Sequence, residues 1–128
     1  MDKAEELRQW FEIANNDLAL AEHAFNNMRP TPDEQICFLC QQSAEKYLKI
    51  FLVSNNIDPP HIHDLEELRK MCEQINNTFN VLQIKCVIIS KYGVMPRYPN
   101  ELQITDTDVR IALQYAKDIK DFVVKIVL

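Results

Sequence analysis

Glycine is almost absent from this chain. Gly93 is the single glycine among 128 residues, and the six prolines fall only around positions 30–32, 59–60 and 96–99. All-β domains need turn residues at short intervals, so this distribution favours helices over sheets. The length suits one hydrophobic core. We therefore expect residues 1–128 to form a single domain.

Long apolar runs and an excess of positive charge are also missing. No run approaches the roughly 20 residues of a membrane span, and the first six residues lack the basic-then-apolar order of a secretory signal. We therefore expect a cytoplasmic protein without membrane contact, whose four cysteines are thiols. Acidic residues outnumber basic ones by 19 to 14, for a net charge of -5. Nucleic acid would need a local basic patch, since the surface as a whole repels phosphates.

Apolar residues recur every three or four positions through most of the chain, which is the spacing of one helix face. This spacing predicts helices over residues 3–27, 33–53, 63–75, 79–92 and from 105 to the end, with an ordered loop over 93–105. We expect Thr31 to cap the second helix with Pro32 at its first position, and Asp64 and Thr105 to begin the third and fifth. The predicted fold is all-α, an up-and-down bundle of four to five helices around the second.

The end of the last predicted helix is apolar on nearly every side. Its sequence is FVVKIVL, over residues 122–128. A monomer would struggle to bury that much apolar surface. We therefore predict a homodimer that uses this helix or the first one.

Four motifs, taken in order, resemble the HEPN domain. They are NDLALA from Asn16, CFLCQQSAEKYLK from Cys37, HDL from His63 and RYP from Arg97. The resemblance covers almost the whole chain. It implies a helical bundle, usually a homodimer, often found in prokaryotes beside a small nucleotidyltransferase. Some members of the family bind nucleotides, and many others are metal-independent, RNA-cutting toxins.

The RNA-cutting members carry an Arg that is followed, after four to six residues, by a His. This pair acts on the RNA phosphate and the ribose 2′-hydroxyl, with two copies meeting across the dimer. None of the five arginines here has a His at that spacing, and Arg97, the best match in position, is followed there by Leu102, Gln103 and Ile104. The missing His argues against RNase activity.

Arg97 and Tyr98 are the first candidates for a binding site, because they stand in the predicted loop. A guanidinium binds phosphate in bidentate fashion, and a tyrosine ring offers a base a stacking face. Lys91 and Arg110 could complete a cationic patch. The structural alternatives are that Arg97 caps the preceding helix or pairs with Asp17, and that Tyr98 anchors the loop in the core.

Lys46 and Lys49 on the second predicted helix are the next candidates. They could line a groove for phosphates, or they could pair with Glu45 and with carboxylates of the first helix. Asp17 stands at the edge of the first apolar stripe, so we expect its carboxylate to be half buried and to need a partner. Lys46 and Arg97 are the two candidates for that partner.

His61, His63 and Asp64 resemble a set of metal ligands. A helix cap explains His63 and Asp64 without an ion, so we predict no metal and no cofactor, and His63 and Asp64 stay candidates for a nucleotide contact. Cys37 and Cys40 have the spacing of a zinc or redox pair. They lie on the inward stripe of the second helix, where cysteine behaves as a small apolar residue, so we predict that both belong to the core.

Three hypotheses for the function stay open. The first is a dimeric HEPN protein that binds a nucleotide or nucleic acid, or pairs with a small nucleotidyltransferase, without cutting RNA. The second is an RNase toxin of a toxin–antitoxin pair with a degenerate motif, in which Arg97 acts with another polar group. The third is a non-catalytic protein–protein interaction module. The site residues are predicted to bind, and none is predicted to be catalytic.

Overall fold

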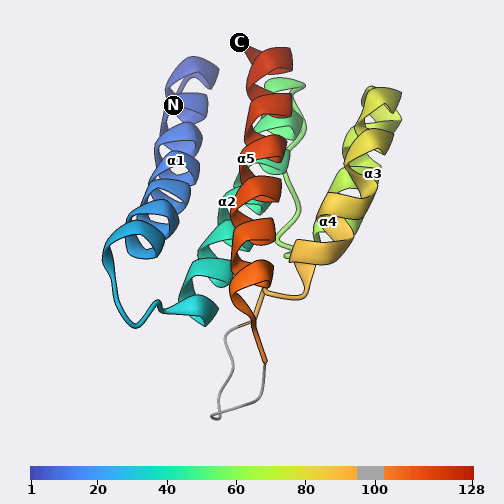
Figure 1. The fold of residues 1–128 in the computed structure, drawn as a ribbon. Helices are drawn as coiled ribbons and strands as arrows, with labels where there is room; N and C mark the ends of the chain where they lie inside the picture. The colour runs from blue at the N-terminus through green and yellow to red at the C-terminus, as the bar shows by residue number, and fades with distance from the viewer. Residues whose placement is uncertain (95–102) are drawn as a thin grey trace.

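The computed structural model describes residues 1–94 and 103–128, which are mainly helical (Figure 1). These residues form five α-helices and one 3-10 helix, and no strand occurs among them. In chain order the elements are α1 (Lys3–Asn27), α2 (Asp33–Ser54), α3 (Leu65–Ile75), η1 (Asn77–Leu82), α4 (Gln83–Ser90) and α5 (Asp106–Val127). The prediction of an all-α helical bundle is confirmed.

α2 lies at the centre of the bundle, as predicted. It contacts α1 and α5 most extensively, and it also packs against α3 and α4. The rings of Phe51 and Phe79 lie 4.5 Å apart between centroids, and those of Phe79 and Phe122 lie 4.9 Å apart. This aromatic cluster joins α2, η1 and α5. Because neighbours surround α2, polar side chains on it can be buried as deeply as apolar ones.

All four cysteines are fully buried free thiols. Burial raises the pKa of Cys37, and likewise the pKa of Cys72 and of Cys86, to about 12. The pKa of Cys40 is raised for the same reason. A thiol in such surroundings stays protonated and packs as an apolar group. The prediction that Cys37 and Cys40 belong to the core is confirmed.

The connection between α2 and α3 turns back along α2 (Figure 1). Asn56 makes the turn with a φ of 63°, in the left-handed region that asparagine tolerates well. The Gln41 amide then donates to the carbonyl oxygen of His63 at 2.8 Å, and the Cys72 thiol donates to the carbonyl oxygen of Leu48 at 3.5 Å. α3 therefore runs in the same direction as α2, and residues 61–64 lie against the middle of α2.

Helix boundaries agree with the predictions for α1, α2, α3 and α5 to within about two residues. Asp64 caps α3 by accepting from the backbone N–H groups of Glu66 and Glu67. Thr105 and Asp108 form a reciprocal capping box at the start of α5, in which the backbone and side-chain hydrogen bonds of Thr105 lower the pKa of the Asp108 carboxyl. Both predicted caps are therefore confirmed.

Two details of the prediction are wrong. Pro32 itself occupies the N-cap of α2, which has no side-chain cap, because a ring without an N–H loses nothing at that position. The predicted helix over residues 79–92 begins as the 3-10 helix η1, where Asn76 accepts from the backbone N–H of Thr78. Phe79 and Leu82 are three residues apart, one turn of a 3-10 helix, so that both reach the core.

The end of α5 is only partly buried. Val123 is buried and Phe122 and Val127 pack against the core, whereas Ile126 is 39% exposed and Leu128 is 82% exposed. None of the helices in the described ranges has an apolar stretch long enough to cross a membrane.

Candidate binding site on the second helix

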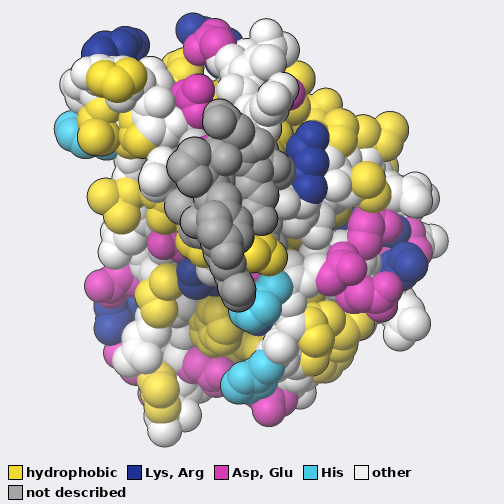
Figure 2. Space-filling model, turned by 90° about the horizontal axis from the view of Figure 1, so that it is seen from below, with side chains coloured by type: hydrophobic (Ala, Val, Ile, Leu, Met, Phe, Trp, Pro, Cys, Tyr) yellow, Lys and Arg dark blue, Asp and Glu magenta, His cyan; other side chains and the backbone are white. Residues whose placement is uncertain are grey.

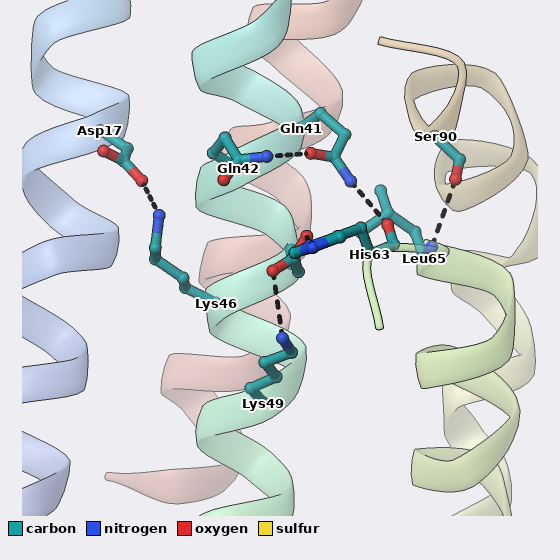
Figure 3. A network of polar contacts seen from close by, with 9 residues as sticks. Asp17, Gln41, Gln42, Lys46, Lys49, His63, Leu65 and Ser90 are labelled. Carbon is teal, nitrogen blue, oxygen red and sulfur yellow. Dashed lines mark hydrogen bonds and ion pairs between the residues drawn. The ribbon is translucent and has the colours of Figure 1, made fainter. Parts of the chain in front are cut away.

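One side of α2 carries charged and amide side chains inside an otherwise apolar bundle (Figure 3). They recur at the spacing of one helix face, between α1 on one side and the returning connection on the other. With two residues from those neighbours they form what we call the α2 polar cluster: Asp17, Gln41, Gln42, Glu45, Lys46, Lys49 and His63.

Asp17 and Lys46 join α1 to α2. The Lys46 ammonium donates to a carboxylate oxygen of Asp17 at 2.5 Å. The Lys46 side chain is 20% exposed and the Asp17 side chain is 17% exposed. The prediction that Asp17 is half buried and needs a partner is confirmed, and Lys46 is that partner. At this depth the pair is partly shielded from water, so its geometry is better fixed than that of a surface ion pair.

Glu45 is the most buried acid of the cluster. Its side chain is 6% exposed, and its two oxygens contact different partners, Lys49 Nζ at 3.1 Å and His63 Nδ1 at 3.0 Å. An ionised carboxylate only accepts hydrogen bonds, so Nδ1 of His63 carries a proton. In the neutral ring Nε2 is then an acceptor, and the His63 side chain that carries it is 71% exposed.

The amides of Gln41 and Gln42 hold the backbone of the connection. Gln42 donates to the Gln41 side-chain oxygen at 2.8 Å, while Gln41 donates to the His63 carbonyl. At the next residues the Leu65 backbone N–H donates to the Ser90 hydroxyl of α4 at 3.2 Å. A Cβ on Gly93 would lie 3.3 Å from the Gln41 amide. His63 is thus located through its backbone as well as through its ring.

A pocket of about 260 Å³ adjoins the cluster. It is lined by Trp10 of α1, by Lys49 of α2 and by five residues of the connection, namely Asp58, Pro59, Pro60, His61 and His63. Figure 2, which views the molecule from below, shows histidine side chains on the surface beside apolar and acidic groups. The pocket therefore combines an aromatic ring, a buried ammonium group and two imidazoles.

Sequence reasoning missed Trp10. The indole is half-buried, packs against the core and lines the pocket. A signal was present in the sequence: Trp10 precedes Asp17 by seven residues, which puts both on the same side of one helix. Glu45 was considered only as a partner for lysine. Its contact with His63 depends on the path of residues 55–64, and no local sequence pattern reveals that path.

The other predicted site residues are distributed differently. Arg97 and Tyr98 lie outside the described residues. Arg110 pairs with Asp106 at 2.7 Å, and its guanidinium lies over the ring of Phe25, 4.9 Å from the centroid. That contact belongs to the side of the bundle between α1 and α5.

His61, His63 and Asp64 are not arranged as metal ligands. Asp64 is occupied as the cap of α3, and His63 is held by Glu45. Within the described residues no three His, Cys, Asp or Glu side chains converge in a way that could hold a metal ion.

Comparison with known proteins identifies the family. A model of the HEPN domain matches residues 7–127. The chain belongs to the HEPN family. No curated protein matches it significantly.

Two solved structures are similar to this HEPN chain. TT1696 from Thermus thermophilus is 23% identical with a TM-score of 0.79, over 93% of this chain and 96% of that one. ST0689, an archaeal HEPN homologue, is 22% identical with a TM-score of 0.73, over 95% of this chain and 98% of that one. At these identities the likeness shows the fold.

Proposed function

We propose that this HEPN protein binds a nucleotide or RNA at the α2 polar cluster without cutting RNA. The observation that carries the proposal is the buried Glu45–Lys49 pair and its contact with the exposed His63. Taking two charges out of water is costly, and apolar residues in their place are often equally or more stable. Such a pair therefore fits a role in holding a ligand group better than a role in stability.

The cluster has the donors that a phosphate needs. Each lysine ammonium has three N–H donors. Lys46 pairs with one acid, Asp17, and Lys49 pairs with one acid, Glu45, so each ammonium has further donors for a phosphate. Asp17 holds Lys46 in place, and the cap at Asp64 holds the end of the connection next to His63. Arg97 and Tyr98 complete the proposed site on the strength of their sequence motif. A local site of this kind suits a protein of net charge -5, which would repel phosphates elsewhere.

The missing Arg–His pair supports binding without RNA cleavage. No histidine follows any arginine at the family's spacing, and the histidine of the cluster is held by a carboxylate instead. The family resemblance also makes a small nucleotidyltransferase a candidate partner for the protein.

We propose a homodimer formed through α1 and α5. A groove of about 530 Å³ between these helices is lined in part by Phe11, Val124 and Leu128. A second apolar surface, with Val81, Ile84 and Val87 each more than half exposed, lies on η1 and α4. Light scattering should report a dimer that Val124→Glu dissociates and Ile84→Glu does not. A monomeric parent protein, or the reverse response of the two variants, would contradict this assignment.

Thermal unfolding of the full chain tests ligand binding. ATP, AMP or a short single-stranded RNA at a hundred times its Kd should stabilise the protein by about 2.7 kcal/mol, a shift of several degrees in Tm. Lys46→Met should abolish most of the shift. Lys85→Met is the matched control, because Lys85 pairs with Asp118 away from the cluster. The proposal fails if none of these ligands shifts Tm at millimolar concentration, and release of RNA fragments by the pure protein would overturn the non-cutting part.

A further inference from the structure

We infer that the pocket beside Lys49 is a base-binding subsite, in which a nucleobase stacks on Trp10 and hydrogen-bonds at its edge to His63. The inference rests on the proposed function and names the part of the ligand that is recognised. The base belongs to a free nucleotide or to single-stranded RNA, two ligands that offer the same aromatic ring system.

Trp10 supplies the stacking surface. It is the single tryptophan of the chain, and its half-buried indole packs against the core while it lines the pocket. Pro59 and Pro60 line the same pocket and add apolar surface. Stacking between a base and an aromatic side chain depends on the two π-faces and tolerates any base. A tryptophan fixed by the core has little conformational freedom to lose on binding.

His63 supplies a fixed hydrogen-bonding group. Glu45 holds its Nδ1 at 3.0 Å and Gln41 holds its backbone carbonyl at 2.8 Å. A ring fixed at one nitrogen presents the other in a defined tautomer and direction. Base edges carry both donors and acceptors, so Nε2 of the neutral ring can accept from an exocyclic amine or ring N–H of the base.

The size of the pocket limits what enters it. At about 260 Å³ it lies below the range of about 300–1,000 Å³ typical of pockets for drug-sized ligands. One base with part of its ribose fits this space better than a whole dinucleotide. The phosphates then lie outside the pocket. Lys46 stands one helical turn from Lys49 on α2 and is placed to meet them.

Two other pockets are less suitable for a nucleotide. The first, of about 770 Å³, lies where α2, α3 and α5 end, and Glu73 lines it without any lysine or arginine. Helix C-termini carry partial negative charge, so that pocket disfavours phosphate. The second, of about 310 Å³, lies between α1 and α5. Its aromatic ring, Phe25, is covered by Arg110, which in turn pairs with Asp106.

Intrinsic fluorescence tests the subsite directly, because all tryptophan emission comes from Trp10. The full chain is titrated with AMP, with a short oligoadenylate and with ribose 5-phosphate. We expect AMP or the oligoadenylate to quench the emission and ribose 5-phosphate, which has no base, to leave it unchanged. Quenching by AMP identifies a free nucleotide as a sufficient ligand, whereas quenching by the oligoadenylate alone identifies RNA. Either result supports the subsite.

Variants measured by calorimetry complete the test. Trp10→Ala should weaken binding of the quenching ligand by roughly 5- to 150-fold, and Trp10→Phe, which keeps an aromatic face and the fold, by less than about 5-fold. Arg110→Gln, at the other pocket, should bind as the parent does. The inference is overturned if these ligands raise Tm while Trp10 emission stays unchanged and both Trp10 variants bind as the parent does. That outcome would leave the proposed function standing. No rise in Tm with any ligand would overturn both.

Discussion

Both sides of α2 carry deeply buried residues, but for different reasons. On the apolar side Cys37, Cys40, Ala44 and Leu48 are fully buried, and their contribution depends on area removed from water rather than on direction. On the polar side each buried atom needs a specific partner. Within the described residues no buried side-chain nitrogen or oxygen lacks one. From this comparison we expect the apolar side to contribute most of the stability, and the polar side to hold His63 in position.

Thiol reactivity should show the largest effect and tests the apolar side. Burial raises the pKa of Cys37 from the ordinary 9.0 to about 12, which alone lowers its thiolate fraction at pH 8 by roughly a thousandfold, and thiolate is the reactive form. All four cysteines should react with a disulfide reagent in denaturant, and none on the same timescale in buffer. Fast labelling of the native protein would show that this side of α2 opens to water.

Leu48→Ala should cause the next largest effect. Leu48 is fully buried, and truncation of such a leucine costs about 2–5 kcal/mol through lost burial and the cavity that remains. Urea unfolding should report this loss. Nucleotide affinity, measured at a temperature where the variant is folded, should stay within about twofold of the parent. Equal losses of stability and of affinity would break the division between the two sides of α2.

A double-mutant cycle on Glu45 and Lys49 sharpens the same comparison. Glu45→Leu leaves the Lys49 ammonium, 8% exposed, without its acid, and we expect a loss of about 1.5–3 kcal/mol, as for other hydrogen bonds to charged groups. Glu45→Leu combined with Lys49→Leu removes both charges and should return to within about 1 kcal/mol of the parent.

The double variant should nevertheless bind nucleotide poorly, because His63 has lost the acceptor of its Nδ1–H. Chemical denaturation and calorimetry on the same samples separate the two effects. Full affinity in the double variant would show that the Glu45–Lys49 pair does not position the ligand.

Ser90→Ala should have the smallest effect. The Ser90 hydroxyl accepts from the backbone N–H of Leu65 at 3.2 Å, and loss of one such bond costs about 1 kcal/mol. Because this bond fixes the start of α3 next to His63, affinity should fall by less than about fivefold. Ser54→Ala is the matched control, since its hydroxyl donates to the Phe51 carbonyl within α2 and should leave affinity unchanged.

Most of the fold could be predicted from the sequence because local spacing encodes it. Ala14, Leu18 and Ala21 recur at three and four residues and are buried as that spacing predicts, and Asp64 and Thr105 cap their helices through short-range hydrogen bonds. The 3-10 helix η1 was missed at the start of the predicted fourth helix, because a spacing of three residues fits either kind of helix.

The site was less predictable because it depends on long-range placement. From the sequence, several acidic residues were possible partners for Lys46 and Lys49. The way α1 packs against α2 places Asp17 next to Lys46. His63 meets Glu45 only because residues 55–64 return along α2, after a turn at Asn56. Arg97 and Tyr98 stay predictions.

Gly93 provides clearance rather than backbone freedom. Its φ is not positive, so other residues could adopt this backbone conformation. A Cβ at this position would lie 3.3 Å from the Gln41 amide and 3.3 Å from the Ser90 carbonyl oxygen. A larger residue there would push Gln41 away from the carbonyl that it holds. Position 93 is therefore a tuning point, through which evolution or a protein engineer could shift the backbone at His63 without replacing any residue of the proposed binding site.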